Sequence, residues 1–234
     1  MKNRVWRVLC LCLLLAACAS FFSCTSEKGE EDETVILDMN ADYALSETLP
    51  KGEGKRVKVI LLLGQSNASG SSIVQYLEQT ADPEDLARYR AGYPSVLINY
   101  CIDDHNACSE GEYVKVDLTC GANDGFFGPE VGMADRFSVA YPDETIFILK
   151  YTMSGYSLHH HWLRAGQRGS IYDAFLIFAK ANMEHLADLG YDARIGAICW
   201  MQGESDTTDF KAERYFENQS AFVSYLREDL APYA

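Results

Sequence analysis

A mostly apolar, partly β-branched run that ends in glycine constrains the fold of this 234-residue chain more than any other feature. The run occupies residues 57–63, and its composition predicts an interior strand of a parallel sheet. Gly64 ends the strand with a turn for which glycine is the least strained residue. Ser66 is then expected to open a helix, whose first amides are placed to stabilise an anion on a bound substrate.

A second strand with polar residues at its end lies far along the chain. Residues 195–200 form a short apolar run, and amide and carboxylate side chains follow at Gln202, Glu204 and Asp206. Open α/β sheets bind ligands at the carboxyl edge of their strands. We therefore favour a functional serine over the simpler interpretation, in which Ser66 or Asn67 only caps a helix.

The two motifs resemble those of the SGNH (GDSL-like) hydrolases, in the branch of sialate O-acetylesterases and acetylxylan esterases. Gly-Gln-Ser-Asn stands at 64–67 and Trp-x-Gln-Gly-Glu-x-Asp at 200–206. Residues 150–158 look like the family's glycine block, and residues 127–132 look like a stretch that starts a helix. Ala68 and Ser154 depart from the usual residues, but neither change removes a reacting group. The resemblance covers residues 57–230.

The resemblance implies a flavodoxin-like α/β fold, a three-layer α/β/α sandwich with a parallel sheet, and a serine esterase without a cofactor. It assigns Ser66 as the nucleophile. Oxyanion donors are the Ser66 N–H, the Gly155 N–H and the Gln202 amide. Glu204 has two interpretations: it orients a catalytic histidine, or it holds the Gln202 loop.

The family also implies two residues in contact with substrate, Asn67 and Trp162. Trp162 follows a histidine triplet at 159–161 and is expected to wall the site. In an extended segment His159 and His161 share a face, but two ligands without a third make a poor zinc site. We expect no metal.

The general base has no counterpart in the sequence. The family takes its histidine from a C-terminal Asp-x-x-His block after a further strand, and no such block follows Asp206. A serine hydroxyl is a weak nucleophile without a base. We therefore expect a chain without the last strand and the catalytic C-terminal block, with feeble turnover and an open strand edge.

The N-terminus predicts export. Residues 1–23 combine three basic residues with an apolar run at 8–17, the pattern of a lipoprotein signal peptide, and this run is too short for a membrane span. Lipid attachment is expected at Cys24, with Cys18 as the alternative. Residues 24–54 are predicted to be an acidic tether and 55–234 the esterase domain. The protein would be a cell-envelope lipoprotein on the periplasmic face or the cell surface, anchored to the membrane.

The net charge restricts the classes of molecule that the chain can bind, and the cysteines restrict its possible disulfides. A formal net charge of −14 argues against nucleic acid, and the glycine-bounded 64–70 segment lacks the Lys-Ser/Thr ending of a phosphate loop. Export permits disulfides, so Cys101 with Cys108 or with Cys120 is a plausible pair, whereas Cys199 lies in a predicted strand. Sequence does not choose between the two pairings.

The remaining pattern alternates strands with helices, which predicts a parallel sheet covered on both faces. Further strands are expected at 95–100 and 145–150, an edge hairpin at 113–118, and helices at 71–79, 83–90, 129–140, 171–189 and 216–230. The predicted function is an exported O-acetylesterase acting on an acetylated carbohydrate, a sialic acid or a xylan-type glycan. The alternative is an inert carbohydrate-binding or scaffold lipoprotein, and an esterase of non-sugar acyl esters is a third possibility.

Overall fold

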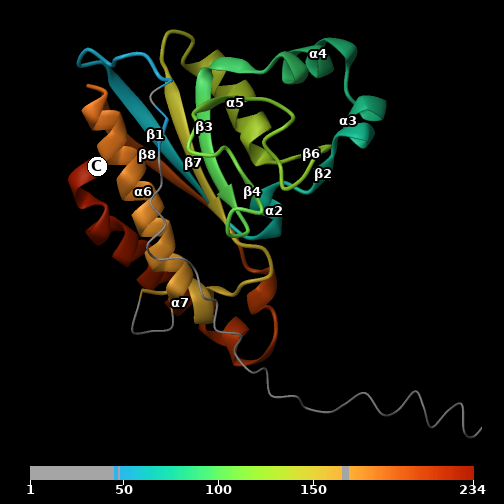
Figure 1. Ribbon diagram of the computed structural model, residues 1–234. Coiled ribbons are helices and arrows are strands. Elements are labelled where there is room, and N and C mark those ends of the chain that lie inside the picture. The colour runs from blue at the N-terminus through green and yellow to red at the C-terminus, as the bar shows by residue number, and fades with distance from the viewer. Residues whose placement is uncertain (1–44, 47, 165–168) are drawn as a thin grey trace, which may run out of the picture. The chain divides into compact units, whose positions relative to one another are not determined.

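The computed structural model describes residues 45–46, 48–164 and 169–234. The expected signal peptide at 1–23, both lipidation candidates Cys18 and Cys24, and most of the expected tether lie outside these residues. The described part is built on one sheet with the strand order β4-β3-β7-β1-β8, in which β5 also pairs with β3 (Figure 1).

The long strands of this sheet run parallel, as the sequence predicts. They are β1 (Arg56–Gly64), β3 (Tyr93–Ile102), β7 (Ile146–Thr152) and β8 (Asp192–Met201). Two short strands, β4 (Ala107–Cys108) and β5 (Val114–Val116), each pair antiparallel with β3. Only β5 lies within the edge hairpin predicted at 113–118, and its partner is β3. The strand that leads to Ser66, β1, lies between β7 and β8.

Helices cover both faces of the sheet (Figure 1). One core cluster joins Val59 and Leu61 of β1 to α6 (Ser170–Asp188) and α7 (Asp209–Asp229). The other joins Ile60 and Leu62 of β1 to the opposite layer, which comprises α3 (Val74–Thr80), α4 (Pro83–Ala91) and α5 (Pro129–Ala140). Alternate β1 residues thus enter opposite cores, which confirms the predicted three-layer α/β/α sandwich.

Two predicted helix boundaries are wrong for identifiable reasons. α7 begins at Asp209 instead of residue 216, because residues 209–215 are mostly polar and give no apolar stripe in the sequence. α3 begins at Val74 instead of residue 71, because β2 (Ser72–Ile73) pairs with β6 (Phe126–Phe127).

Among the described residues, no helix combines the length and apolarity of a membrane span.

The folded domain starts earlier than residue 55, which corrects the predicted tether boundary. Leu49 is only 8% exposed. The Gly52 N–H donates to Leu189 O at 2.7 Å, and the Ser46 N–H donates to Gly111 O at 3.1 Å. This stretch has no strand or helix pattern, so its packing was not visible in the sequence.

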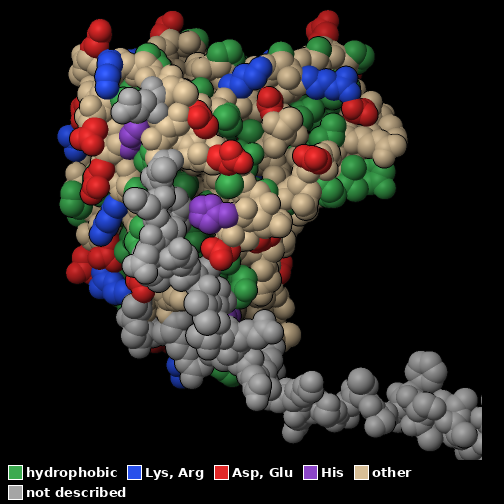
Figure 2. All heavy atoms as spheres, in the orientation of Figure 1, with side chains coloured by type: hydrophobic (Ala, Val, Ile, Leu, Met, Phe, Trp, Pro, Cys, Tyr) green, Lys and Arg blue, Asp and Glu red, His purple; other side chains and the backbone are tan. Residues whose placement is uncertain are grey.

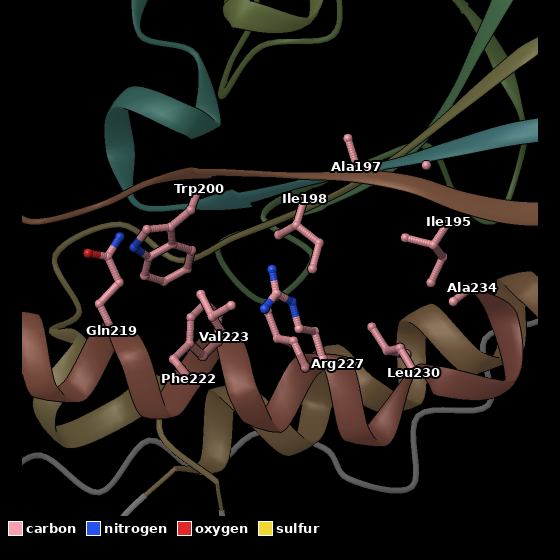
Figure 3. A pocket seen from close by; sticks show the side chains of 12 residues that line it. Ile195, Ala197, Ile198, Trp200, Gln219, Phe222, Val223, Arg227, Leu230 and Ala234 are labelled. Atoms are coloured by element: carbon pink, nitrogen blue, oxygen red, sulfur yellow. The ribbon is translucent and has the colours of Figure 1, made fainter.

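A groove of about 600 Å³ runs along β8 at the edge of the sheet. Within the described residues β8 pairs with β1 alone, so its outer edge is open. Figure 3 shows Phe222, Val223 and Arg227 of α7 pointing toward this strand. The groove lining includes none of Ser66, Gly155 or Gln202 and is separate from the predicted catalytic site.

The open edge predicts self-association, because unpaired strand edges and apolar grooves promote it. A charge placed on the edge at Ala197→Lys should reduce the light scattering of a concentrated sample severalfold. Val139→Lys, on a side chain 70% exposed in α5, is the matched control and should change scattering little. Equal scattering of both variants and the parent chain would show that the β8 edge does not drive association.

Candidate active site

Three strands end side by side at the predicted catalytic edge. Gly64, the last residue of β1, is in register with Thr152 of β7 and with Met201 of β8. Two backbone bonds extend this pairing beyond the strands: Met153 N–H donates to Gly64 O at 3.0 Å, and Gln65 N–H donates to Met201 O at 3.1 Å. The sheet therefore brings the Ser66, Gly155 and Gln202 blocks to one place, as predicted.

Gly64 is required by close approach of two strand ends. Its φ is +149°, and a Cβ atom there would lie 2.0 Å from Met201 O. We expect Gly64→Ala to destabilise the fold by about 3 kcal/mol, through strain and overpacking. In a thermal melt this is a decrease of about 6–12 °C.

Gly132→Ala is the control for that melt. Gly132 lies in α5 and has open space where a Cβ would be added. Alanine favours a helix over glycine, so its Tm should stay equal or rise. If Gly64→Ala and Gly132→Ala had the same Tm, the ends of β1 and β8 at Gly64 and Met201 would be able to separate at little cost.

Ser66 opens the one-turn helix α2 (Ser66–Ser69), as expected. The residue at the helix cap is Gln65, so the interpretation of Ser66 or Asn67 as a simple cap is wrong. Ala68 and Ser69 donate their N–H groups to Gln65 O. Among the described residues nothing hydrogen-bonds to the Ser66 hydroxyl or accepts its N–H. Both groups are thus available to a ligand.

The buried amide of Gln65 ties the two sequence motifs together, and the sequence analysis missed it. Gln65 is 3% exposed. Its Oε1 accepts the N–H of Ser205 at 3.3 Å and that of Gly203 at 3.5 Å. The partners lie 138 and 140 residues away in sequence. The Gly-Gln-Ser-Asn motif therefore uses its glutamine as a structural bridge.

Asn67 and Glu204 form a second bridge at the surface. Asn67 Nδ2 donates to Glu204 Oε1, and both residues are exposed. The donor is a side-chain amide, whereas the loop-holding interpretation of Glu204 expected backbone N–H donors. Asn67 is placed beside Ser66 and remains a candidate substrate contact.

The amide of Gln202 points inward. Its Nε2 donates to Asp206 Oδ2 at 2.6 Å and to Tyr156 O at 3.2 Å. The Tyr215 hydroxyl donates to Gln202 O at 2.5 Å, and Gln202 Oε1 lies 3.1 Å from the same hydroxyl. Burial raises the pKa of that phenol, which keeps it a donor. An amide nitrogen has two hydrogens, so Gln202 reaches a substrate oxygen only after it releases one of these bonds.

Asp206 is a buried carboxylate at the end of the motif that follows β8. It is 1% exposed, and its two oxygens accept the N–H groups of Leu158 at 2.7 Å and His159 at 3.1 Å. These groups begin η1 (Leu158–Trp162), one turn of π-helix. Asp206 lies in the short 3₁₀ helix η2 (Glu204–Asp206). Together with Gln202 it fixes the segment after Gly155 against the β8 loop.

Gly155 lies on an exposed turn, and the residues just before it are fixed by hydrogen bonds. Its φ is +83°, a conformation that favours glycine. The preceding Ser154 donates its N–H to Asp103 Oδ1 at 2.6 Å. Ser69 Oγ contacts the hydroxyls of Thr152 at 2.9 Å and Ser154 at 3.3 Å. This turn lies beside the α2 turn, which it contacts through Ser154 and Ser69.

Trp162 does not wall a substrate site, which corrects the sequence prediction. It has no exposed surface, and its ring packs edge-on against Trp200 at a centroid distance of 5.1 Å. Its Nε1 is buried without a hydrogen-bond partner in the described residues. The π-helix turns the side chain into the core between α6 and α7, where the extended segment assumed from sequence would have left it outside.

The histidine triplet belongs to the same π-helix. His159 Nδ1 is 2.9 Å from Asn218 Nδ2 of α7, and His161 Nδ1 is 3.2 Å from Ser157 Oγ. Within the described part of the chain, no three His, Cys, Asp or Glu side chains gather as metal ligands.

A buried ion pair contacts the α2 turn (Ser66–Ser69), and the sequence analysis did not predict it. The side chains of Lys150 in β7 and Glu130 in α5 are both fully buried, and Lys150 Nζ lies 2.8 Å from Glu130 Oε2. Lys150 Nζ also donates to Ser69 O at 2.8 Å and Cys120 O at 2.9 Å. Glu130 Oε1 accepts the Gly128 N–H at 2.8 Å. All three ammonium hydrogens are thus used, one of them by the helix that Ser66 opens.

Comparison with known protein families decides the assignment. The family described as "Carbohydrate esterase, sialic acid-specific acetylesterase" matches residues 56–233. The chain belongs to this family. The match spans the sheet, both helix layers and the three blocks at its catalytic edge, and it confirms the resemblance inferred from the motifs.

Two solved structures share the fold of this acetylesterase family member. A protein from Arabidopsis thaliana is 21% identical, with a TM-score of 0.53 over 74% of this chain and 69% of that chain. NanS is 15% identical, with a TM-score of 0.54 over 77% of this chain and 64% of that chain. At these identities the likeness shows the fold alone. No curated protein matches this family member.

Proposed function

We propose that this chain is a carbohydrate O-acetylesterase domain in which Ser66 attacks the acetyl ester of a sialic acid or a xylan-type glycan. The observation that carries the proposal is the register of Gly64 with Thr152 and Met201. It places the Ser66, Gly155 and Gln202 blocks at one sheet edge. The Ser66 hydroxyl and N–H are both free of partners among the described residues.

The proposed reaction is acyl transfer through the serine. Ser66 Oγ attacks the ester carbonyl carbon while a base removes its proton, and negative charge develops on the carbonyl oxygen. The N–H groups of Ser66 and Gly155 stabilise that charge, joined by the Gln202 amide once it leaves Tyr156 O. The sugar alcohol departs, and water then hydrolyses the acetyl-serine.

The general base is not among the contacts of Ser66 in the described residues. We therefore propose that this polypeptide by itself turns over slowly. Acetate release from O-acetylated sialic acid and from acetylated xylan tests the substrate class, with p-nitrophenyl acetate as a general reporter of serine acylation. Hydrolysis of the aryl ester together with no acetate release from either glycan would contradict a carbohydrate esterase.

A second candidate is an inert carbohydrate-binding lipoprotein. The inward bonds of the Gln202 amide, which occupy its nitrogen, favour it. Binding of an acetylated glycan without acetate release, unchanged in Ser66→Ala, would support this candidate.

Acidic charge limits the partners. On the face shown in Figure 2, Lys and Arg side chains are scattered among Asp and Glu side chains. The chain carries a net charge of −14, and phosphate backbones require clustered basic residues. The proposed partner is a neutral or acetylated glycan, with no nucleic acid.

We further propose export and lipid anchoring at the cell envelope, on the signal pattern of residues 1–23. Cys24→Ala should move most of the protein from the membrane fraction to the soluble fraction, because the lipid would be lost. Fractionation followed by immunoblotting measures this, with Cys18→Ala as the matched control. Release by Cys18→Ala alone would place the lipid on Cys18, and retention of both variants would argue against a lipoprotein.

A further inference from the structure

Cys101 and Cys108 face each other across the antiparallel pair of β3 and β4. The N–H of Asp103 donates to β7, whereas Tyr100 O accepts the N–H of Ser109 beside β4. The N–H and C=O groups of successive residues in a strand point to opposite sides. Because Asp103 bonds to β7 and Tyr100 bonds to the β4 side, the N–H and C=O of Cys101 point toward β7. Cys101 and Cys108 therefore form a non-hydrogen-bonded pair, in which Cα atoms lie about 4.5 Å apart and side chains are closest.

The other described thiols are poorly placed to compete. Cys101 belongs to the core on the α6 side of the sheet, together with Tyr113 and Phe147. Cys120 belongs to the opposite core, and Cys199 packs against that core from β8. The sheet itself separates Cys101 from Cys120, which resolves the two pairings that the sequence leaves open.

We propose that Cys101 and Cys108 form a disulfide when the protein meets a disulfide-bearing oxidant such as oxidised glutathione. All four described cysteines are free thiols in this structure. The Cα separation expected for this strand pair lies at the short end of the range that a disulfide spans, about 4.4–6.8 Å. The proposal does not depend on esterase activity.

The chemistry proceeds by two exchanges. The half-buried Cys108 attacks the oxidant as a thiolate, forms a mixed disulfide and releases one thiol. Cys101 then loses its proton, attacks the Cys108 sulfur and releases the second thiol. The pair gives up two electrons and two protons, and the oxidant disulfide becomes two thiols. Burial raises the pKa of Cys101 to about 12, so the second exchange is slow and accelerates as pH rises.

The cross-link would close a strained turn next to the catalytic edge. Asp103, Asp104 and His105 follow β3 with φ values of 49°, 53° and 67°, a conformation that such residues rarely adopt. Asp103 accepts the Ser154 N–H at 2.6 Å, immediately before Gly155. Oxidation therefore stabilises the hairpin that holds the glycine turn.

Peptide mapping tests the pairing in the full chain. Residues 91–115 form one tryptic peptide that contains both cysteines. After incubation with oxidised glutathione, this peptide should weigh two hydrogens less than its reduced form and resist alkylation. The oxidised chain should melt about 5 °C higher than the reduced chain.

Serine variants make the result specific. Cys108→Ser should remove the melting shift, whereas Cys120→Ser should keep it. Two alkylated thiols on residues 91–115 after oxidation would overturn the proposal, as would a cross-link from Cys101 to Cys120. An equal melting shift in Cys108→Ser would also overturn it.

Discussion

Free imidazole is expected to accelerate p-nitrophenyl acetate hydrolysis by this chain about tenfold or more, and Ser66→Ala is expected to abolish that acceleration. Without imidazole the rate should be several orders of magnitude below that of a complete serine esterase. The physical reason is that the Ser66 hydroxyl has no hydrogen-bond partner among the described residues. A diffusible base supplies the missing proton acceptor.

Imidazole itself cleaves the aryl ester, so the quantity measured is the rate above that of Ser66→Ala at the same imidazole concentration. Ser72→Ala is a matched control on an exposed hydroxyl close to the same turn, and it should leave the acceleration intact. Robust turnover without imidazole that Ser66→Ala removes would place the base within the chain and point to His159, His160 or His161. Identical rates for the parent and Ser66→Ala would exclude Ser66 as the nucleophile.

Lys150→Met is expected to destabilise the fold by about 3–5 kcal/mol, because it leaves the Glu130 charge buried without its partner. For a domain of this size the Tm would fall by roughly 6–20 °C. The loss also leaves Ser69 O and Cys120 O without the donor they now share. Thermal unfolding followed by circular dichroism measures the effect.

Two variants separate the buried charge from a general effect of removing lysine. Lys58 pairs with Glu144 at the surface, where both side chains are more than 40% exposed, so Lys58→Met should cost at most about 1 kcal/mol. The double variant Lys150→Met with Glu130→Gln should recover part of the loss, because no charge stays buried. A double variant less stable than Lys150→Met would show that the remaining hydrogen bonds matter more than the charge.

The fold was predictable because its evidence is local. Residues 57–63 and 195–200 are apolar enough to indicate strands, and their flanking glycines and polar residues mark where the strands end. Periodicity failed where polar residues are helical, at the start of α7, and where a segment packs without regular structure, around Leu49 and Gly52. Those positions depend on neighbours that only the folded chain supplies.

The site was predictable in outline and less so in detail. The blocks of Ser66, Gly155 and Gln202 meet at one edge because the three parallel strands that lead to them end there together. The direction of a side chain does not follow from spacing. Trp162 turns into the core because η1 is a π-helix, and the Gln202 amide turns to Asp206 because that carboxylate is buried.

The central place of β1 in the sheet has a consequence for the time at which the site forms. Gly64 pairs with Thr152 on one side and with Met201 on the other. At about 5–20 residues per second, a ribosome needs roughly 7–30 s to make the ~140 residues from Gly64 to Met201. During that interval this largely apolar strand lacks its neighbours on both sides and requires protection from aggregation. The nucleophile turn, made early, is thus among the last parts of the molecule to take its final shape.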